Sequence, residues 1–207
     1  MEVQLLHSTP LNICSNAIRT CWQSFDKSDN GGEKDLELID RVGNKYKHSS
    51  TLEHLYYNFY IKGISRACLQ ELSRHRMASL SVKSSRYTLK ELKNENAFLP
   101  SNDENLKRAD KFIVKTGDSE VDNMLLISLE NLRLLTQSKS NDIAKYAMPE
   151  CYKTELSWSI NARSLQNFLS LRSSKSALWE IQLLAKAIFE TLPQEHKFIF
   201  DDCISKQ

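Results

Sequence analysis

The chain has 207 residues, 41% of them hydrophobic, and a formal net charge of +2. This length supports one substantial core, so we expect a single domain covering residues 1–207. The small net charge excludes a global polycation. The five cysteines form no Cys-x-x-Cys pair, and neither a secretion signal nor an apolar run of about 18 residues is present. We therefore expect a reduced cytoplasmic protein with no disulfide framework, no metal site and no membrane span.

Short elements are expected before residue 48. The apolar run at residues 3–6 predicts a strand that Pro10 ends. Asn12 is placed to cap a helix, and residues 26–34 predict a loop because they are rich in charge and glycine. Apolar spacing at positions 36, 39 and 42 predicts a short helix that ends near Gly43. The apolar stripe expected on the first helix is Ile13, Ala17, Ile18, Cys21 and Trp22.

A strand and a helix are expected to follow. Residues 48–54 predict a helical turn, and residues 55–62 alternate between apolar and polar side chains, which predicts a strand. Apolar residues at positions 64, 67, 68 and 72 then fit a helix that ends at Arg74.

Residues 74–87 form a basic run that is also rich in serine. Arginine forks and serine hydroxyls together suit phosphate and other oxyanions. A solvated basic turn is the alternative for such a run. The helix dipole accounts for one or two cations at the end of a helix, but not for the serines that follow.

The second half of the chain predicts further helices and one strand. Residues 90–119 are polar and predict a surface excursion, whereas residues 121–135 predict a buried helix with its apolar stripe at positions 121, 125, 132 and 135. Residues 154–160 alternate as a strand. A helix is expected over residues 161–172, and another carries apolar residues from 178 to 188 before Pro193. The buried stripe of the helix over 161–172 is expected at Ala162, Leu165, Phe168 and Leu169.

Neither a Gly-x-Gly-x-x-Gly segment nor a P-loop is present. A nucleotide or flavin would therefore have to be held by side chains, which fits the density of arginine.

Two motifs resemble the flavin-dependent thymidylate synthases, the ThyX family. The family pattern Arg-His-Arg-x-x-Ser-x-Asn-Glu-x-Ser-x-Arg-Tyr matches residues 74–87 at seven of nine specified positions, with departures at Ser81 and Val82. Residues 161–172 closely resemble the second family segment, Asn-Ala-Arg-Ser-Leu-x-Asn-Phe-Leu-x-Leu-Arg. The resemblance covers roughly residues 48–90 and 142–190 and rests on two independent motifs in the right order.

The resemblance implies an α+β fold in which a mixed or antiparallel sheet is flanked by helices. It also implies reductive methylation of dUMP to dTMP, with 5,10-methylenetetrahydrofolate as carbon donor, FAD as hydride carrier and NADPH as reductant. Family members are homotetramers with shared active sites, so we expect the same here. We expect no nucleic acid or membrane partner.

Residue roles are carried over by the same match. Arg172 is expected to be catalytic, as a fixed cation beside the uracil. Lys145 stands where the family often has Arg, and would hold phosphate as a point charge. The residues expected to bind dUMP are Glu71, Arg74, Ser84, Ser85, Arg86, Lys145 and Arg172. The residues expected to bind FAD are His48, Ser50, Arg74, His75, Arg76, Asn161, Arg163 and Asn167.

Two alternatives remain open. A non-catalytic nucleic-acid binder would use the basic run with Tyr56, Tyr57 and Tyr60, although a net charge near zero counts against it. A flavoprotein of this fold without synthase activity is the other, because Ser81 and Val82 replace the Asn and Glu of the family pattern.

Overall fold

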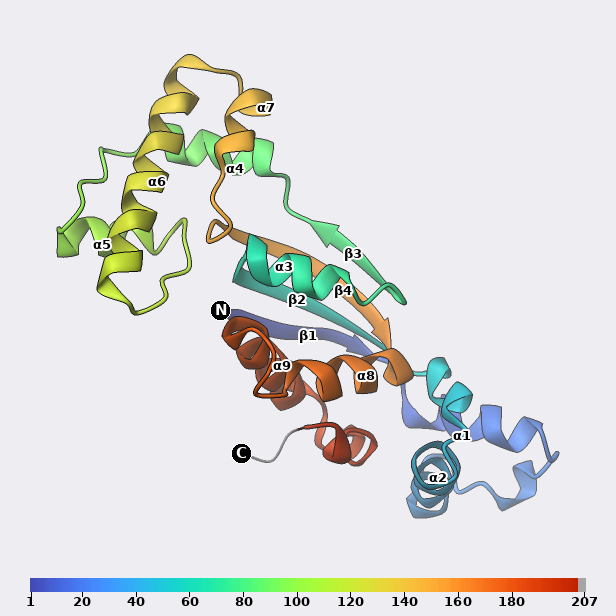
Figure 1. Ribbon diagram of the computed structural model, residues 1–207. Helices are drawn as coiled ribbons and strands as arrows, with labels where there is room; N and C mark the ends of the chain where they lie inside the picture. The colour runs from blue at the N-terminus through green and yellow to red at the C-terminus, as the bar shows by residue number, and fades with distance from the viewer. Residues whose placement is uncertain (205–207) are drawn as a thin grey trace. The chain divides into compact units, whose positions relative to one another are not determined.

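The computed structural model describes residues 1–204 and has an α+β architecture (Figure 1). Its strands are β1 (Glu2–Ser8), β2 (Tyr56–Ser65), β3 (Ala78–Val82) and β4 (Lys153–Asn161). The α-helices are α1 (Leu11–Thr20), α2 (Glu33–Ile39), α3 (Arg66–Ser73), α4 (Ser85–Lys93), α5 (Asp103–Ala109), α6 (Ser119–Ser138), α7 (Asn141–Ala144), α8 (Ala162–Arg172) and α9 (Trp179–Thr191). The 3-10 segments are η1 (Phe25–Lys27), η3 (Ser49–His54), η4 (Lys145–Ala147), η5 (Gln194–Ile199) and η6 (Asp201–Cys203), and η2 (Asp40–Lys45) is a π-helix.

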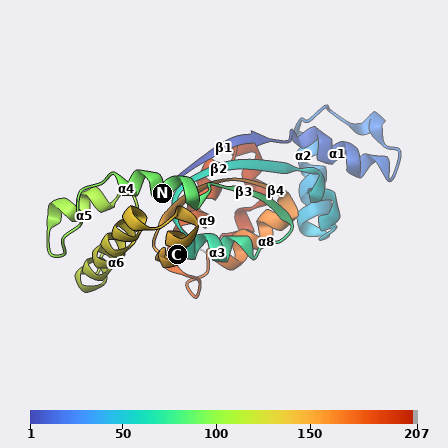
Figure 2. The same ribbon diagram turned by 90° about the horizontal axis from the view of Figure 1, so that it is seen from above.

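The four strands form one sheet in the order β1-β2-β4-β3 (Figures 1 and 2). The end of β1 meets the start of β2, where the Thr9 amide donates to the Tyr56 carbonyl at 2.9 Å. The end of β3 meets the early part of β4 through the Lys83 amide and the Glu155 carbonyl, also at 2.9 Å. Such pairing of ends with starts is antiparallel, which confirms the expected fold class.

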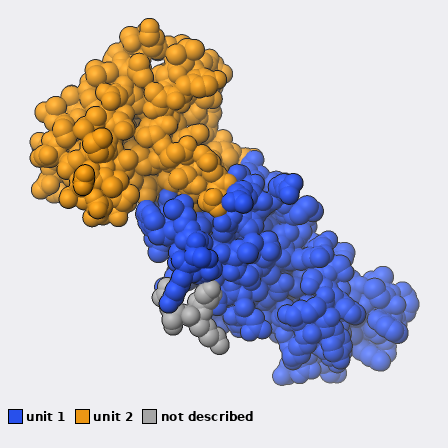
Figure 3. Space-filling view, viewed as in Figure 1, with its two compact units in different colours: residues 1–61, 72–80, 157–207 blue, residues 62–71, 81–156 orange. Residues whose placement is uncertain are grey.

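The chain divides into two compact units (Figure 3). Among the described residues, unit 1 contains 1–61, 72–80 and 157–204, and unit 2 contains 62–71 and 81–156. The expectation of a single domain stays a prediction.

Unit 1 has its core between the sheet and helices α8 and α9. The predicted alternation in β2 is confirmed, because Tyr57, Phe59 and Ile61 are fully buried whereas Tyr56 is half-exposed. Helix α9 packs on β1 and on α8. The buried face of α8 is the stripe expected from the sequence, so its opposite face can carry polar side chains to a site.

Unit 2 has a second core, which the sequence did not reveal. Phe98, Phe112 and Ile113 are buried in it together with Leu126 and Leu129 of α6. The interpretation of residues 90–119 as a surface excursion is therefore wrong. Apolar residues that are widely spaced in the sequence come together here only through tertiary packing.

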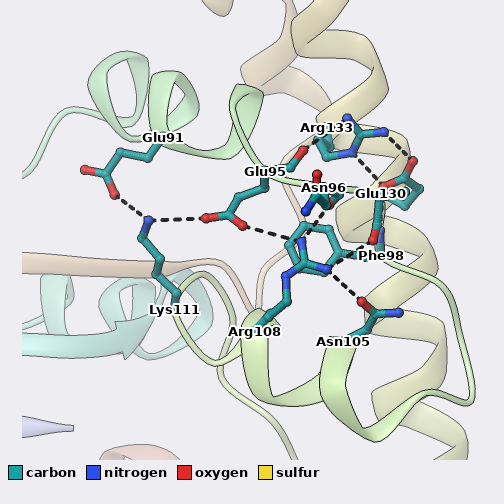
Figure 4. A network of polar contacts seen from close by, with 10 residues as sticks. Glu91, Glu95, Asn96, Phe98, Asn105, Arg108, Lys111, Glu130 and Arg133 are labelled. Carbon is teal, nitrogen blue, oxygen red and sulfur yellow. Dashed lines mark hydrogen bonds and ion pairs between the residues drawn. The ribbon is translucent and has the colours of Figure 1, made fainter.

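A polar network fixes residues 95–102 onto helices α5 and α6 (Figure 4). Arg108 donates to the Asn105 carboxamide at 2.7 Å and to the Asn96 carbonyl at 2.8 Å, and its guanidinium lies over the Phe98 ring at 4.6 Å. The Phe98 amide donates in turn to Glu130 of α6 at 2.9 Å. These contacts satisfy the backbone of an irregular segment that would otherwise lose its hydrogen bonds on burial.

Several expected boundaries and stripes are wrong. Helix α1 begins at Leu11 after Pro10, so Asn12 lies inside it, and its buried face is Leu11, Cys14, Ser15, Ile18 and Arg19. Trp22 is 82% exposed. The helix expected to end near Gly43 continues into η2, and the core face of α6 is centred on Leu126, Leu129 and Leu132. The strand β3 and the helix α4 were not predicted within or after the basic run.

Gly43 is required by a close approach. A Cβ at this buried position would lie 2.8 Å from Cδ2 of Leu52, which is itself fully buried in η3. The glycine therefore lets η2 and η3 pack together at the edge of the cavity described next.

Candidate functional site

Unit 1 contains a cavity of about 890 Å³, within the usual range for small-molecule sites. Four segments that are distant in the sequence line it. From η2, η3 and their connection come Asn44, Lys47, Ser49 and Glu53, and from the basic run come Arg74, His75, Arg76 and Met77. From β4 and α8 come Asn161, Arg163, Ser164, Gln166, Asn167, Ser170, Leu171 and Arg172, and the last segment gives Phe198, Ile199, Asp202 and Cys203.

Helix α8 supplies the polar wall of the cavity. Asn161 caps its start, where the Asn161 Oδ1 accepts a hydrogen bond from the Ser164 amide at 2.8 Å. Because the buried stripe of α8 faces the core, residues 163, 166, 167 and 170 share the opposite face at helical spacing and reach the cavity.

Gln166 joins three of the lining segments. Its Nε2 donates to the Asn44 Oδ1 at 3.1 Å and to the Ile199 carbonyl at 2.7 Å. The side-chain Nδ2 of Asn44 donates to the Phe198 carbonyl at 3.1 Å. These bonds connect η2, α8 and η5, and so fix the cavity wall without using a charged group.

The basic run enters the cavity directly after α3. His75 is buried, its amide donates to the Leu72 carbonyl at 3.1 Å, and its ring meets Phe168 edge-on at 5.0 Å. The Nε of Arg172 donates to the Nε2 of His75 at 3.0 Å. The two motifs found in the sequence therefore meet within one unit.

The cavity is electropositive. Five cationic side chains line it, those of Lys47, Arg74, Arg76, Arg163 and Arg172, against two carboxylates. Glu53 is one of the two, and it pairs with Arg163 at 2.6 Å. A set rich in guanidinium, amide and hydroxyl groups fits a diphosphate and the polar edges of a flavin, so the residues present suit FAD.

Metal binding and a thiolate nucleophile have little support at this site. Within residues 1–204, no three His, Cys, Asp or Glu side chains are grouped to hold a metal ion. Burial raises the pKa of the Cys203 thiol, so this lining residue is a neutral thiol at pH 7.

Most of the residues expected to bind FAD lie together. Arg74, His75, Arg76, Asn161, Arg163 and Asn167 all line the cavity, as does Arg172. His48 and Ser50 are exposed and are not among the lining residues, whereas their neighbours Lys47 and Ser49 are. The roles of all of these residues stay predictions.

The other residues expected to bind dUMP belong to unit 2. Ser84 and Ser85 begin α4, and Arg86 in its first turn pairs with Asp142 of α7 at 2.8 Å. Helix α4 also packs on η4, which begins at Lys145. The serines, Arg86 and Lys145 thus belong to elements that pack together, and Glu71 lies in α3.

The sequence interpretation missed thirteen of the twenty lining residues, among them Asn44, Lys47, Glu53 and Gln166. These four lie in or between segments already singled out, but nothing in their spacing marks them. Gln166 could have been found, because it shares the polar face of α8 with Arg163 and Asn167.

Comparisons with known proteins agree with this geometry. A family profile described as "Thymidylate synthase complementing protein" matches residues 4–196. The flavin-dependent thymidylate synthase of Campylobacter jejuni (strain RM1221) is 66% identical over 207 residues, which span 100% of this chain and 99% of that protein. The flavin-dependent thymidylate synthase of Helicobacter pylori (strain ATCC 700392 / 26695) is 65% identical over 206 residues, 99% of each chain.

Solved structures give the same result. A crystal structure of the flavin-dependent thymidylate synthase ThyX from Helicobacter pylori, complexed with FAD and dUMP, is 64% identical to this chain. It covers 99% of this chain and 100% of its own, with a TM-score of 0.95. Two sequence motifs, the cavity in which they meet and similarity along the full length all lead to one conclusion: the chain belongs to the flavin-dependent thymidylate synthase family.

Proposed function

We propose that this chain converts dUMP to dTMP by reductive methylation, with 5,10-methylenetetrahydrofolate as carbon donor and NADPH as reductant. The observation that carries the proposal is the electropositive cavity in which the basic run meets α8. Full-length similarity to a ThyX structure complexed with FAD and dUMP supports it.

FAD would occupy the cavity of unit 1. Its ligands would be His48, Ser50, Arg74, His75, Arg76, Asn161, Arg163 and Asn167, of which all but the first two line the cavity. The guanidinium groups would pair with the diphosphate, and the asparagine amides would bind polar edges of the ring system. Bound FAD supplies the hydride.

The dUMP phosphate would be held by Ser84, Ser85, Arg86 and Lys145. Ser84, Arg86 and Lys145 are exposed and Ser85 is half-buried. Hydroxyls and cations of this kind suit a phosphate, and Lys145 acts as a point charge without a fork. We also assign Glu71, Arg74 and Arg172 to the nucleotide.

Arg172 would activate the uracil. The C5 carbon becomes a better nucleophile when negative charge at N3, O2 or O4 is stabilised by a nearby cation. A guanidinium can do this without exchanging a proton, and a preformed charge costs little reorganisation during the reaction. Arg172 would thus act through its field on the substrate.

The expected assembly is a homotetramer in which several chains share each active site. The five free cysteines fit the reducing cytoplasm that we propose for it. No helix in residues 1–204 is both long and apolar enough to cross a membrane.

The direct test is dTMP formation by the purified protein with FAD, NADPH, dUMP and 5,10-methylenetetrahydrofolate, each omitted in turn. We expect dTMP only in the complete mixture. If the protein shows no flavin absorption, binds no added FAD and instead binds polynucleotide with a steep salt dependence, the enzyme proposal fails. If the flavin is oxidised without dTMP, the protein is a flavoprotein without synthase activity.

A further inference from the structure

The hydrogen bond between Arg172 and His75 defines the protonation state of the histidine. The Nε of a guanidinium is always a donor, so the Nε2 of His75 must accept at 3.0 Å. The imidazole is then neutral, with its proton on Nδ1. An imidazolium could not make this contact, because both of its nitrogens are donors.

The His75 ring is fixed by burial and by packing against an aromatic side chain. It is 8% exposed, and its ring meets Phe168 edge-on at 5.0 Å, where Phe168 in turn meets Trp158 at 5.0 Å. Phe168 lies one helical turn before Arg172 in α8. The ring that accepts from Arg172 is therefore packed into the same core as the helix that carries Arg172.

Arg172, by contrast, is only half-buried. It is the last residue of α8, and neighbouring Leu171 is 55% exposed. An arginine side chain loses up to about 2 kcal/mol of rotamer entropy when it is held in one conformation. A bond at Nε fixes the plane of the guanidinium, and a charge held in place acts on a substrate more strongly than a mobile one.

We propose that His75 is a positioning residue for Arg172: its neutral imidazole holds the guanidinium in the orientation that stabilises the activated uracil. This inference rests on the proposed function and deepens it. It gives His75 a task on the dUMP side of the reaction, distinct from the contact to FAD that the family resemblance implies. Around the pair, the charged groups that line the cavity are Lys47 and Glu53, then Arg74, Arg76 and Arg163, and Asp202 of η6.

Two substitutions separate positioning from packing. His75→Gln keeps an acceptor near the position of Nε2, whereas His75→Leu keeps the apolar volume and loses the acceptor. We expect His75→Leu to lower kcat per bound flavin by about 10- to 100-fold while the KM for dUMP changes little. FAD content is measured in parallel, because His75 is also assigned to the flavin. His75→Gln should recover most of the kcat. Equal losses in both variants, or loss of FAD in proportion to activity, would overturn the inference.

A matched control uses another buried histidine. His196 of η5 is 3% exposed and is bonded to the Tyr57 hydroxyl at 2.8 Å, so His196→Leu also removes a buried imidazole. We expect it to lower stability without lowering kcat per bound flavin. A fall in kcat equal to that of His75→Leu would show that loss of stability alone explains both.

A spectroscopic readout is independent of turnover. With ¹⁵N-labelled histidine, the NMR signals of His75 in the full-length protein should report the neutral ring with its proton on Nδ1. In Arg172→Met the same signals should shift toward the Nε2–H form. A wild-type ring that is protonated on Nε2 would overturn the inference even if dTMP is formed, and failure of dTMP formation with the expected tautomer would count against the proposed function alone.

Discussion

Arg163 Nη1 donates to Glu53 Oε1 at 2.6 Å, so a carboxylate of η3 is paired with a guanidinium of α8 in the electropositive cavity. Both side chains are about half exposed. An anionic ligand that uses Arg163 must compete with this carboxylate.

Glu53→Gln should therefore tighten FAD binding. Exposed ion pairs contribute at most about 1 kcal/mol, which corresponds to a gain of about two- to fivefold in affinity. Fluorescence titration of the flavin-free protein measures it. Glu37→Gln, which removes an exposed carboxylate of α2 away from the cavity, is the control and should leave the affinity unchanged. Weaker binding by Glu53→Gln would show that Glu53 contacts the ligand favourably.

The buried pair of Arg19 and Asp35 should dominate the stability of the first 45 residues. Nε and Nη2 of Arg19 reach one Asp35 oxygen at 3.0 and 2.5 Å, and both side chains are almost fully buried. Burial alone would raise the pKa of Asp35, but hydrogen bonds from Arg19, Ser28 and the Gly31 amide outweigh it and hold the pKa below its usual value.

Arg19→Met leaves this carboxylate buried without its cation. We expect the free energy of unfolding in urea at pH 7 to fall by about 3–5 kcal/mol. Arg19→Met combined with Asp35→Asn should recover part of the loss. Lys45→Met, which breaks the exposed pair with Asp40, is the control and should change stability little. A small effect of Arg19→Met would contradict the account.

The pair of Tyr57 and His196 should make stability depend on pH. Burial lowers the pKa of His196 from its ordinary value of 6.5 and raises that of Tyr57. As the pH falls, His196 therefore takes up a proton in the unfolded chain before it does so in the folded chain. The contribution of neutral His196 to folding stability is complete above about pH 6.5 and is lost as the pH falls from there toward the folded pKa. Urea unfolding between pH 5 and 8 in wild type and His196→Gln should show a smaller slope in the variant, and equal slopes would contradict the assignment.

Asn161 should have two separable roles. Its Oδ1 caps α8, and loss of such a cap costs about 1 kcal/mol. Asn161→Ser should keep most of the stability that Asn161→Ala loses, because a serine hydroxyl also caps. Both should weaken FAD binding if the Asn161 amide contacts the flavin. FAD affinity equal to wild type in Asn161→Ser would leave Asn161 as a cap alone.

Elements with a complete local pattern could be predicted from the sequence. Strict alternation gave β2 and β4, and the helical stripe together with a motif gave α8. Strand β3 could not be predicted, because its five residues become a strand by pairing with β4, which is distant in the sequence. The core of unit 2 was missed for a similar reason, since Leu89, Phe98 and Phe112 are too far apart to show a period.

The site residues that could be predicted were likewise those in a local sequence pattern. The motifs identified Arg163, Arg172 and the basic run because their residue types are unusual at that spacing. Lys47 and Glu53 lie in segments whose position depends on the contact between Gly43 and Leu52. That contact could not be predicted from the sequence.

The most direct measurement is an anaerobic single turnover. Protein with prereduced FAD is mixed with dUMP and 5,10-methylenetetrahydrofolate, and flavin oxidation is followed by absorbance while dTMP is quantified by chromatography. The account predicts one dTMP for each flavin oxidised in the wild type, and a much slower reaction in Arg172→Ala with its FAD retained. Flavin oxidation without dTMP in the wild type, or an unchanged rate in Arg172→Ala, would contradict it.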